Sequence, residues 1–292
     1  MVTRKGTRRS ILLASCASEA ILRERKDARP DVLLLELEDQ VPSALKSEAR
    51  SRALEVLKTW SFSGMERWIR MNPIESVEGL RDLLALPEGR PDALMPTKIR
   101  RAEEVIAADY VLSQREEELG LPAGSIRLCP MIETGLGILN LRDIISASTR
   151  VCGVLLGSED LSVDVGFTRT ADDRDLEWVR TSIVLTAHSL GVECFDVASL
   201  KIDDPDAVVS EARRAYLMGF DGKGCIASTQ VASVHQGFAP EAAQIAWARN
   251  LLAQKKQAEL QGQRELVVDG RTVEQPVLIQ AARLLRRAGL ES

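Results

Sequence analysis

Residues 32–71 read VLLLELEDQVPSALKSEARSRALEVLKTWSFSGMERWIRM. The stretch opens with an apolar run at 32–35, continues with helically spaced apolar residues at about 44–60, and closes with a second apolar run at 68–71. Continuous apolar runs are typical of strands that are buried on both faces, as in parallel sheets. The stretch therefore predicts a strand, a helix and a second strand parallel to the first.

The same alternation continues along most of the chain. Further apolar runs lie at 11–14, 93–95, 126–131, 151–156, 192–195 and 222–226, with helix-like segments at about 19–26, 77–86, 102–119, 136–146, 176–190 and 206–218. Eight strands that alternate with helices predict a (β/α)₈ TIM barrel. A doubly wound open sheet is the alternative, but about six strands would complete it. No G-x-G-x-x-G follows the first strand, so its nucleotide-binding form is disfavoured.

The pattern changes after Pro240. Residues 240–261 predict one long amphipathic helix, 265–273 a hairpin that turns at Asp269-Gly270, and a last helix begins at Pro276 and ends near Gly289. We expect a catalytic barrel domain over residues 1–238. The extension over residues 239–292 is expected to cap the barrel or to reach a neighbouring subunit.

The composition excludes several kinds of site. The chain has two histidines, His188 and His235, so a zinc site of three histidines is impossible and a Ser-His-Asp triad would need one of the two. We interpret both as structural residues. The net charge of −5 gives no basic field for nucleic acid, and no apolar run approaches the ~20 residues that span a membrane.

The N-terminus and the cysteines predict a cytoplasmic protein. The apolar run that follows Arg8-Arg9 is too short for an export signal, which needs ~7–15 apolar residues. The five cysteines are odd in number and form no C-x-x-C pair. A reducing compartment fits this pattern best.

Charged residues follow nearly every predicted strand, at the end where barrel enzymes carry their sites. They are Glu36, Glu38, Asp39, Arg70, Lys98, Glu133, Glu159, Asp160, Asp196 and Lys223. Solvated strand ends are the alternative, but a set confined to one end favours a site. Several carboxylates in one cavity repel each other, so some are protonated, paired or bound to a cation.

The residue types at this rim indicate the chemistry. Oxygen ligands with few histidines favour Mg²⁺, or Mn²⁺, over zinc. Arg70 can bind a substrate carboxylate through two parallel hydrogen bonds, which a lysine cannot do. A divalent cation chelated by a 2-oxo acid would stabilise an enolate while a carbon–carbon bond breaks.

Five motifs at the rim occur in a characteristic order: Leu35-Glu36-Leu37-Glu38-Asp39-Gln40-Val41-Pro42, Ile69-Arg70-Met71-Asn72-Pro73, Met131-Ile132-Glu133-Thr134, Gly157-Ser158-Glu159-Asp160-Leu161 and Gly219-Phe220-Asp221-Gly222-Lys223. Together they resemble the citrate lyase beta-subunit-like family of the HpcH/HpaI aldolase superfamily, which includes malyl-CoA lyases. The resemblance implies a (β/α)₈ barrel that forms trimers or hexamers, with Mg²⁺ held by Glu133 and Asp160. It also implies that Arg70 binds the carboxylate end of the substrate.

The chain departs from the family pattern on the thioester side. Leu13-Ala14-Ser15-Cys16 stands where the family usually has Phe-Val-Pro-Gly, near the CoA portion, and Ile226-Ala227-Ser228 stands where it has Ile-His-Pro. Glu274 occupies the place of an aspartate that CoA-using relatives often supply across a subunit boundary. The metal side therefore matches the family more closely than the thioester side does.

We expect a Mg²⁺-dependent carbon–carbon lyase that cleaves a 3-hydroxy acid or its CoA thioester by an aldol- or Claisen-type reaction. The expected products are a 2-oxo acid or an acetyl-type product. The expected catalytic residues are Arg70, Glu274, Asp39 and Lys98, the substrate-binding residues Arg70, Glu38 and Ser158, and the metal ligands Glu133 and Asp160.

The expected partners are a small-molecule substrate and further copies of the chain in a homo-oligomer, without nucleic acid or membrane. Two other functions stay open from the sequence. One is a malyl-type thioesterase, in which the same site would hydrolyse the thioester. The other is a non-catalytic subunit of the same family that binds a metabolite or a partner.

Overall fold

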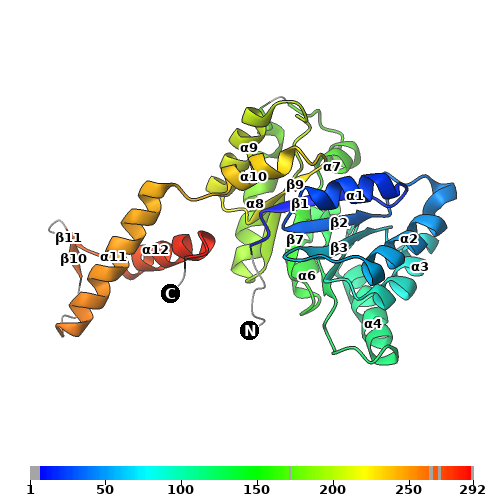
Figure 1. Ribbon diagram of the computed structural model, residues 1–292, viewed down its shortest axis with the longest axis horizontal. Coiled ribbons are helices and arrows are strands. Elements are labelled where there is room, and N and C mark those ends of the chain that lie inside the picture. The colour runs from blue at the N-terminus through cyan, green and yellow to red at the C-terminus, as the bar shows by residue number, and fades with distance from the viewer. Residues whose placement is uncertain (1–6, 171, 263–265, 269–270, 291–292) are drawn as a thin grey trace. The chain divides into compact units, whose positions relative to one another are not determined.

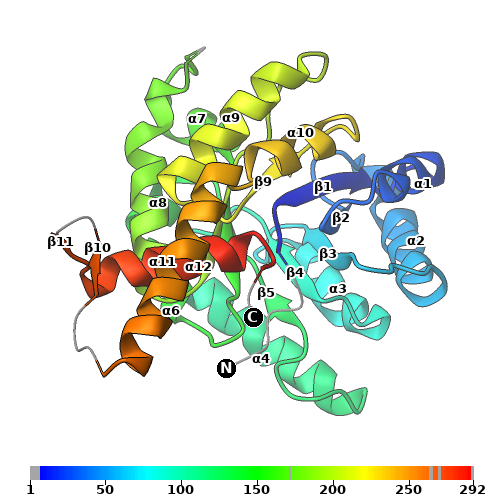
Figure 2. The same ribbon diagram turned by 60° about the vertical axis from the view of Figure 1, so that its left-hand side comes forward.

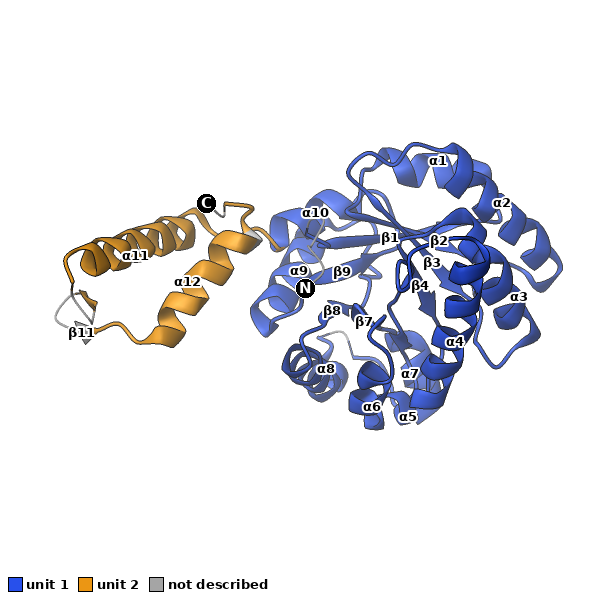
Figure 3. Cartoon of the chain, turned by 90° about the horizontal axis from the view of Figure 1, so that it is seen from below, with its two compact units in different colours: residues 1–237 blue, residues 238–292 orange. Residues whose placement is uncertain are grey.

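The computed structural model describes residues 7–170, 172–262, 266–268 and 271–290. The chain forms two compact units, Met1–Gly237 and Phe238–Ser292 (Figure 3). The first unit contains a parallel β-sheet with its helices, and the second contains two long helices and a short hairpin.

The predicted apolar runs of the first unit form nine strands of one sheet. They are β1 (Ser10–Ser15), β2 (Val32–Glu36), β3 (Glu66–Met71), β4 (Ala93–Pro96), β5 (Arg127–Leu128), β6 (Met131–Ile132), β7 (Gly153–Leu156), β8 (Glu193–Asp196) and β9 (Gly222–Cys225). Their order in the sheet is β5-β4-β3-β2-β1-β9-β8-β7-β6. Every neighbouring pair is parallel, as the βαβ pattern predicts.

Strands β5 and β6 are the two halves of the predicted fifth strand, which is interrupted near Pro130, a residue with no N–H for a ladder. Leu128 of β5 pairs with Leu94 of β4 on one side and forms a bridge to Val151 on the other. Half-strand β6 pairs with β7. The pairing therefore returns on itself and closes the sheet into a barrel, which confirms the predicted fold class.

Helices lie on the outer side of these strands (Figures 1 and 2). They are α1 (Glu19–Asp27), α2 (Lys46–Thr59), α3 (Val77–Ala85), α4 (Ala102–Glu118), α5 (Gly135–Leu139), α6 (Leu141–Ser146), α7 (Ser158–Val165), α8 (Glu177–Ser189), α9 (Pro205–Met218) and α10 (Gln230–Gly237). Three short 3₁₀ helices lie at Ser43–Leu45, Leu86–Gly89 and Arg174–Leu176.

Two helices differ from the prediction. The single helix expected over 136–146 is divided into α5 and α6 at Asn140, whose side-chain amide donates a hydrogen bond to the Arg100 carbonyl at 2.8 Å. Helix α7 was not expected. It begins directly after β7, so Glu159 and Asp160 lie in its first turn instead of in a loop.

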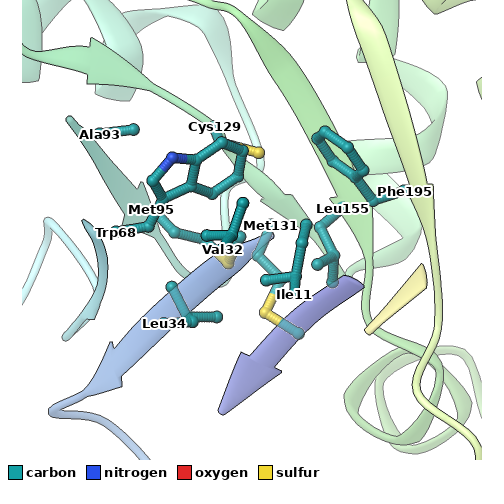
Figure 4. Packing of buried hydrophobic residues seen from close by; sticks show 10 residues of the cluster. All are labelled: Ile11, Val32, Leu34, Trp68, Ala93, Met95, Cys129, Met131, Leu155 and Phe195. Carbon is teal, nitrogen blue, oxygen red and sulfur yellow. The ribbon is translucent and has the colours of Figure 1, made fainter. Parts of the chain in front are cut away.

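The barrel interior is filled by side chains from alternate positions of neighbouring strands, which converge in Figure 4. The cluster consists of Ile11, Val32, Leu34, Trp68, Ala93, Met95, Cys129, Met131, Leu155 and Phe195. The rings of Trp68 and Phe195 meet edge to face, with centroids 5.6 Å apart. Arg8 lies 5.3 Å from the Trp68 ring centroid and forms ion pairs with Glu66 and Glu193. The barrel is thus a packed core, and a ligand can enter only at an end.

The second unit contains α11 (Ala242–Leu260), the antiparallel strands β10 (Val267–Val268) and β11 (Arg271–Thr272), and α12 (Gln275–Arg287). The predicted turn residues Asp269 and Gly270 lie outside the described residues. Apolar residues of both helices, together with Leu266 directly before β10, form a small core of their own: Ala248, Leu251, Ala258, Leu266, Leu278 and Ala281. That this extension caps the barrel or reaches another subunit stays a prediction.

Within the described ranges, none of the helices combines the length and the apolar character that crossing a membrane requires.

Candidate active site

A pocket of about 250 Å³ lies at the C-terminal ends of the barrel strands. Its floor is the top layer of the barrel core, formed by Leu34, Met95, Met131 and Leu155. Polar residues line its wall: Asp39, Gln40, Arg70, Glu133, Ser158, Glu159 and Asp160. Five of the ten charged residues that the sequence predicts at the rim therefore line one cavity, together with Ser158, and an apolar surface lies beneath them.

Arg70 stands on β3 and is held by carboxylates that follow β2. The parallel register places Glu36 directly opposite Arg70, and the Glu36 carboxylate forms an ion pair with Arg70 Nε. Arg70 Nη2 lies 3.0 Å from Glu38 Oε2 and 3.5 Å from Asp39 Oδ2. Burial alone would lower the pKa of Arg70, but the surrounding carboxylates outweigh it and raise the pKa. The guanidinium stays charged and is fixed in one orientation.

Glu36 is the residue beneath this arrangement whose role the sequence does not reveal. Its side chain is fully buried, and burial raises its pKa. Its Oε1 atom accepts the Glu38 N–H at 2.6 Å, so the same carboxylate orders both the arginine and the start of the acidic loop. Glu36 thus positions Arg70 without lining the pocket.

Replacing Glu36 by glutamine is expected to weaken substrate binding through Arg70. The amide keeps the volume but loses the charge that fixes Nε, and orienting residues of this kind typically contribute about 10–100-fold. Steady-state kinetics should show the loss mainly in KM, with Glu36→Asp intermediate. A loss of thermal stability at unchanged KM would instead mean a purely structural role for Glu36.

Lys98 lies between the acidic residues that follow β2, Glu38 and Asp39, and Asp160 of α7. Its Nζ donates a hydrogen bond to Glu38 Oε1 and lies 3.4 Å from Asp39 Oδ1 and 3.8 Å from Asp160 Oδ2. Its backbone is left-handed, with φ of 56°, and its N–H donates to Glu133 Oε1 at 2.8 Å. A non-glycine residue in this conformation is strained, and such strain often occurs at functional sites. Here the strained backbone holds the Glu133 carboxylate.

The charges around Lys98 decide its protonation. Burial would lower the pKa of Lys98, but the hydrogen bond to Glu38 and the charges of Asp39 and Asp160 raise it above its usual range. Burial and the hydrogen bond with Asp39 raise the pKa of Glu38. Burial alone would raise the pKa of Asp39, but the hydrogen bond with Glu38 and the positive charges of Arg70 and Lys98 outweigh it and lower the pKa. Lys98 is therefore an ammonium group and Asp39 a carboxylate.

Glu133, directly after β6, and Asp160, in the first turn of α7, line the same pocket. Glu133 is buried, and its burial together with repulsion from Asp160 raises its pKa to about 8. A divalent cation would remove this repulsion, and carboxylate oxygens are the donors that Mg²⁺ prefers. The buried Glu133 and the partly exposed Asp160 together fit a hard cation.

Gly157 makes room for Glu133. A Cβ atom at Gly157 would lie 2.5 Å from Glu133 Oε2 and 2.7 Å from its Cβ, closer than side chains approach each other. The end of β7 therefore needs glycine, because the Glu133 carboxylate packs directly over it.

Substituting alanine for Gly157 is expected to displace the Glu133 carboxylate and to weaken Mg²⁺ binding about 10–100-fold. Titration with Mg²⁺ would measure the change. Gly135→Ala is the matched control, because its new Cβ would come closest to the end of the Val165 side chain, at 3.0 Å, and would meet Asp164 only at an ordinary contact distance of 3.6 Å. Equal Mg²⁺ affinity in both variants would contradict the role of Gly157.

Ser158 lines the pocket but has no histidine base. Its hydroxyl donates to Glu159 Oε1 at 3.1 Å. His235 instead contacts Ser10 Oγ, 2.8 Å from its Nε2, while Asp31 Oδ1 lies 3.5 Å from the same nitrogen. Ser10 is fully buried at the start of β1, at the opposite end of the barrel. A serine and a carboxylate that share one ring nitrogen do not form a catalytic triad.

Five charged residues predicted at the rim lie outside the pocket lining. Glu36, Glu38 and Lys98 contact the lining residues Arg70 and Glu133, whereas Asp196 and Lys223 do not line the site or support it. Lys223 and Asp196 are buried and paired at 3.1 Å, and Arg180 Nε donates to Asp196 at 2.8 Å. Arg180 lies on α8, so the network ties the sheet to a covering helix. These two residues are structural.

Glu274 is the N-cap residue of α12 in the second unit, and its carbonyl accepts the Val277 N–H at 3.0 Å. Its catalytic role stays a prediction, because the residues that line the pocket all belong to the first unit.

Comparisons with known proteins converge on one family. The family model HpcH/HpaI aldolase/citrate lyase matches residues 9–228. Citrate lyase subunit beta from Haemophilus influenzae is 29% identical over 281 residues, covering 96% of this chain and 97% of that protein. Mitochondrial citramalyl-CoA lyase from Rattus norvegicus is 28% identical and covers 96% and 86% of the two chains.

A solved structure agrees with the sequence relatives. Protein CitE from Mycobacterium tuberculosis, in complex with magnesium, acetoacetate and coenzyme A, superposes with a TM-score of 0.76 at 28% identity. The match covers 98% of this chain and all of that one.

Proposed function

The chain belongs to the HpcH/HpaI aldolase/citrate lyase family, and from this premise we propose that it is a Mg²⁺-dependent lyase that cleaves a carbon–carbon bond in a 3-hydroxy acid or its CoA thioester. The family resemblance of its five motifs is confirmed by the match over residues 9–228. One observation carries the proposal: Glu133, a buried acid, and Asp160, a partly exposed one, line the same pocket as Arg70 and together fit a hard cation.

Glu133 and Asp160 are the residues that would hold Mg²⁺, or Mn²⁺ in its place. When bound, the cation supplies Lewis-acid stabilisation for negative charge on the carbonyl oxygen of the 2-oxo acid product. The left-handed Lys98 backbone and Gly157 hold Glu133 ready for this task, so little rearrangement is needed on binding.

Arg70 would bind the carboxylate of the 2-oxo acid half. Its Nε and Nη2 atoms are occupied by Glu36 and Glu38, and among the described residues no acceptor takes Nη1. Glu38 accepts hydrogen bonds from both Arg70 and Lys98, so it holds these two positively charged side chains on the substrate-binding side of the pocket. Ser158 lines the pocket beside them and can donate to a substrate oxygen.

Cleavage breaks the bond between the hydroxyl-bearing carbon and its neighbour. The hydroxyl proton must leave, and the neighbouring carbon, which departs as an enolate, must gain a proton. Asp39 is an ionised, half-exposed carboxylate of the pocket and can accept the first proton. Lys98 stays protonated and stabilises developing negative charge. We assign the second transfer, to carbon, to Glu274.

The products test this function directly. Incubation with citramalyl-CoA, malyl-CoA and simple 4-hydroxy-2-oxo acids should release a 2-oxo acid from at least one of them. Release of free CoA without a 2-oxo acid would identify a thioesterase instead. The departures at Leu13-Ala14-Ser15-Cys16 and at Ala227 make this comparison between thioesters and free acids informative.

We further propose that the chain forms a homo-oligomer, a trimer or a hexamer, in which Glu274 of one copy serves the pocket of another. The Arg70→Lys and Glu274→Gln variants should then each be weakly active alone. Their mixture, after dissociation and reassembly, should regain activity, because some pockets combine an intact Arg70 with an intact Glu274. Absence of recovery in a reassembled mixture would contradict sharing between copies.

A cytoplasmic location is the accompanying proposal. All five cysteines are free, and four of them are buried, which agrees with a reducing compartment. Fractionation of cells that express the full chain would test it, with recovery outside the cytoplasm as the contrary result.

A further inference from the structure

We propose that His188, Cys194 and Asp221 form a second metal site, for a zinc-like cation, at the N-terminal end of the barrel. His188 lies in the last turn of α8, Cys194 is the second residue of β8, and Asp221 directly precedes β9 (Figure 3). The pocket described above lies at the other ends of these strands. The proposed site is therefore independent of the lyase site.

The three ligand atoms lie close to one another. His188 Nε2 is 3.0 Å from Asp221 Oδ2 and 3.8 Å from Cys194 Sγ, and all three atoms fall within 4.8 Å of one another. Zinc bonds to sulfur, nitrogen and oxygen measure about 2.0–2.3 Å, which at tetrahedral angles places ligand atoms roughly 3.3–3.6 Å apart. Small side-chain movements would bring the three atoms to these separations.

Backbone hydrogen bonds fix two of the ligands in place. The Asp221 N–H donates to the Cys194 carbonyl at 2.9 Å, and the Cys194 N–H donates to Asp221 Oδ2 at 3.1 Å. The turn after α8 is closed by the Val192 N–H, which donates to the Ala187 carbonyl at 3.0 Å. His188 is thereby kept beside the two strands, with part of its side chain in solvent.

The mixture of ligands selects the kind of metal. A thiolate with an imidazole and one carboxylate suits a borderline-soft cation such as Zn²⁺, whereas Mg²⁺ prefers oxygen ligands alone. Binding would replace the thiol proton of Cys194, which is released to water as the sulfur–metal bond forms. A water molecule from the exposed side of His188 would complete four-coordination. The metal would tie α8 to the starts of β8 and β9 and so stabilise the barrel.

Cobalt(II) is the probe, because a thiolate bound to it produces a charge-transfer band in the near ultraviolet. The full chain is titrated with Co²⁺ in the presence of saturating Mg²⁺, which keeps the acidic pocket occupied. We expect one equivalent of Co²⁺ to produce the band and Zn²⁺ to abolish it by displacement. Zn²⁺ should also raise the melting temperature by about 5 °C at concentrations far above its Kd.

Variants separate this site from other cysteines and from the lyase site. Cys194→Ser should lose the band, whereas Cys225→Ser, which changes a buried cysteine of the neighbouring strand, should retain it. His188→Gln alters a partly exposed side chain, so it should fold normally and weaken Co²⁺ binding at least about 10-fold, with lyase turnover unchanged. No band in the wild-type protein, a band that persists in Cys194→Ser, or unaltered affinity in His188→Gln would each overturn the proposal.

Discussion

Replacing Glu133 by glutamine is expected to lower kcat/KM about 10³-fold or more, because the variant loses one of the two carboxylates that would hold Mg²⁺. Stability should not fall with it. Burial and repulsion from Asp160 already raise the pKa of Glu133 to about 8, so the uncharged amide removes an electrostatic strain from the metal-free protein.

Thermal unfolding with and without Mg²⁺ distinguishes metal loss from misfolding. The wild-type protein should gain stability on adding Mg²⁺, since a ligand that binds only the folded state stabilises it, whereas Glu133→Gln should not. Glu159→Gln is the matched control, because Glu159 lies beside Asp160 on α7 but pairs with Arg169. A Glu133→Gln variant with normal turnover would show that Glu133 is not a metal ligand.

Changing Arg70 to lysine is expected to raise the Kd for the 2-oxo acid product about 10²-fold while keeping the protein folded. Lysine retains the positive charge that Glu36 and Glu38 require, but its single ammonium group cannot contact both carboxylates and also offer the substrate a separate donor, as Nη1 of Arg70 does. Arg70→Met, in contrast, would leave the buried Glu36 carboxylate unpaired and should destabilise the protein by about 3–5 kcal/mol.

Calorimetric titration with pyruvate or oxaloacetate in saturating Mg²⁺ would measure the Kd of the wild-type protein and of Arg70→Lys for the oxo acid. Arg169→Lys serves as the control, because Arg169 pairs with acids at the outer rim. Equal affinities of Arg70→Lys and the wild-type protein for the oxo acid would place its carboxylate elsewhere in the pocket.

The strands could be predicted because both of their faces are buried, so each appears in the sequence as an uninterrupted apolar run. Helix α7 could not, and its sequence explains why. Leu161, Val163 and Val165 are apolar at alternate positions, which is a strand-like period. The helix begins at Ser158, directly after β7, and ends at Val165, before Gly166, whose backbone is left-handed. Its position depends on the direction of the chain after the strand, which the apolar pattern does not indicate.

The candidate site was predictable in its residues but not in its arrangement. The apolar runs placed Arg70, Lys98, Glu133 and Asp160 at strand ends, and the barrel brings those ends together. That Glu36 supports Arg70 depends on the register between β2 and β3, which no spacing along the chain reveals. Glu274 belongs to the second unit, which has a core of its own. The sequence alone does not indicate whose pocket Glu274 would serve, that of its own copy or that of another.

The most direct test of the central claim is to measure both products of thioester cleavage in the same reaction, before and after removal of divalent cations with a chelator. For the thioester that is its substrate, the protein should release equal amounts of a 2-oxo acid and an acyl-CoA such as acetyl-CoA. The chelator should abolish this release and added Mg²⁺ should restore it. Turnover that survives the chelator, or free CoA without any 2-oxo acid, would contradict a magnesium-dependent carbon–carbon lyase.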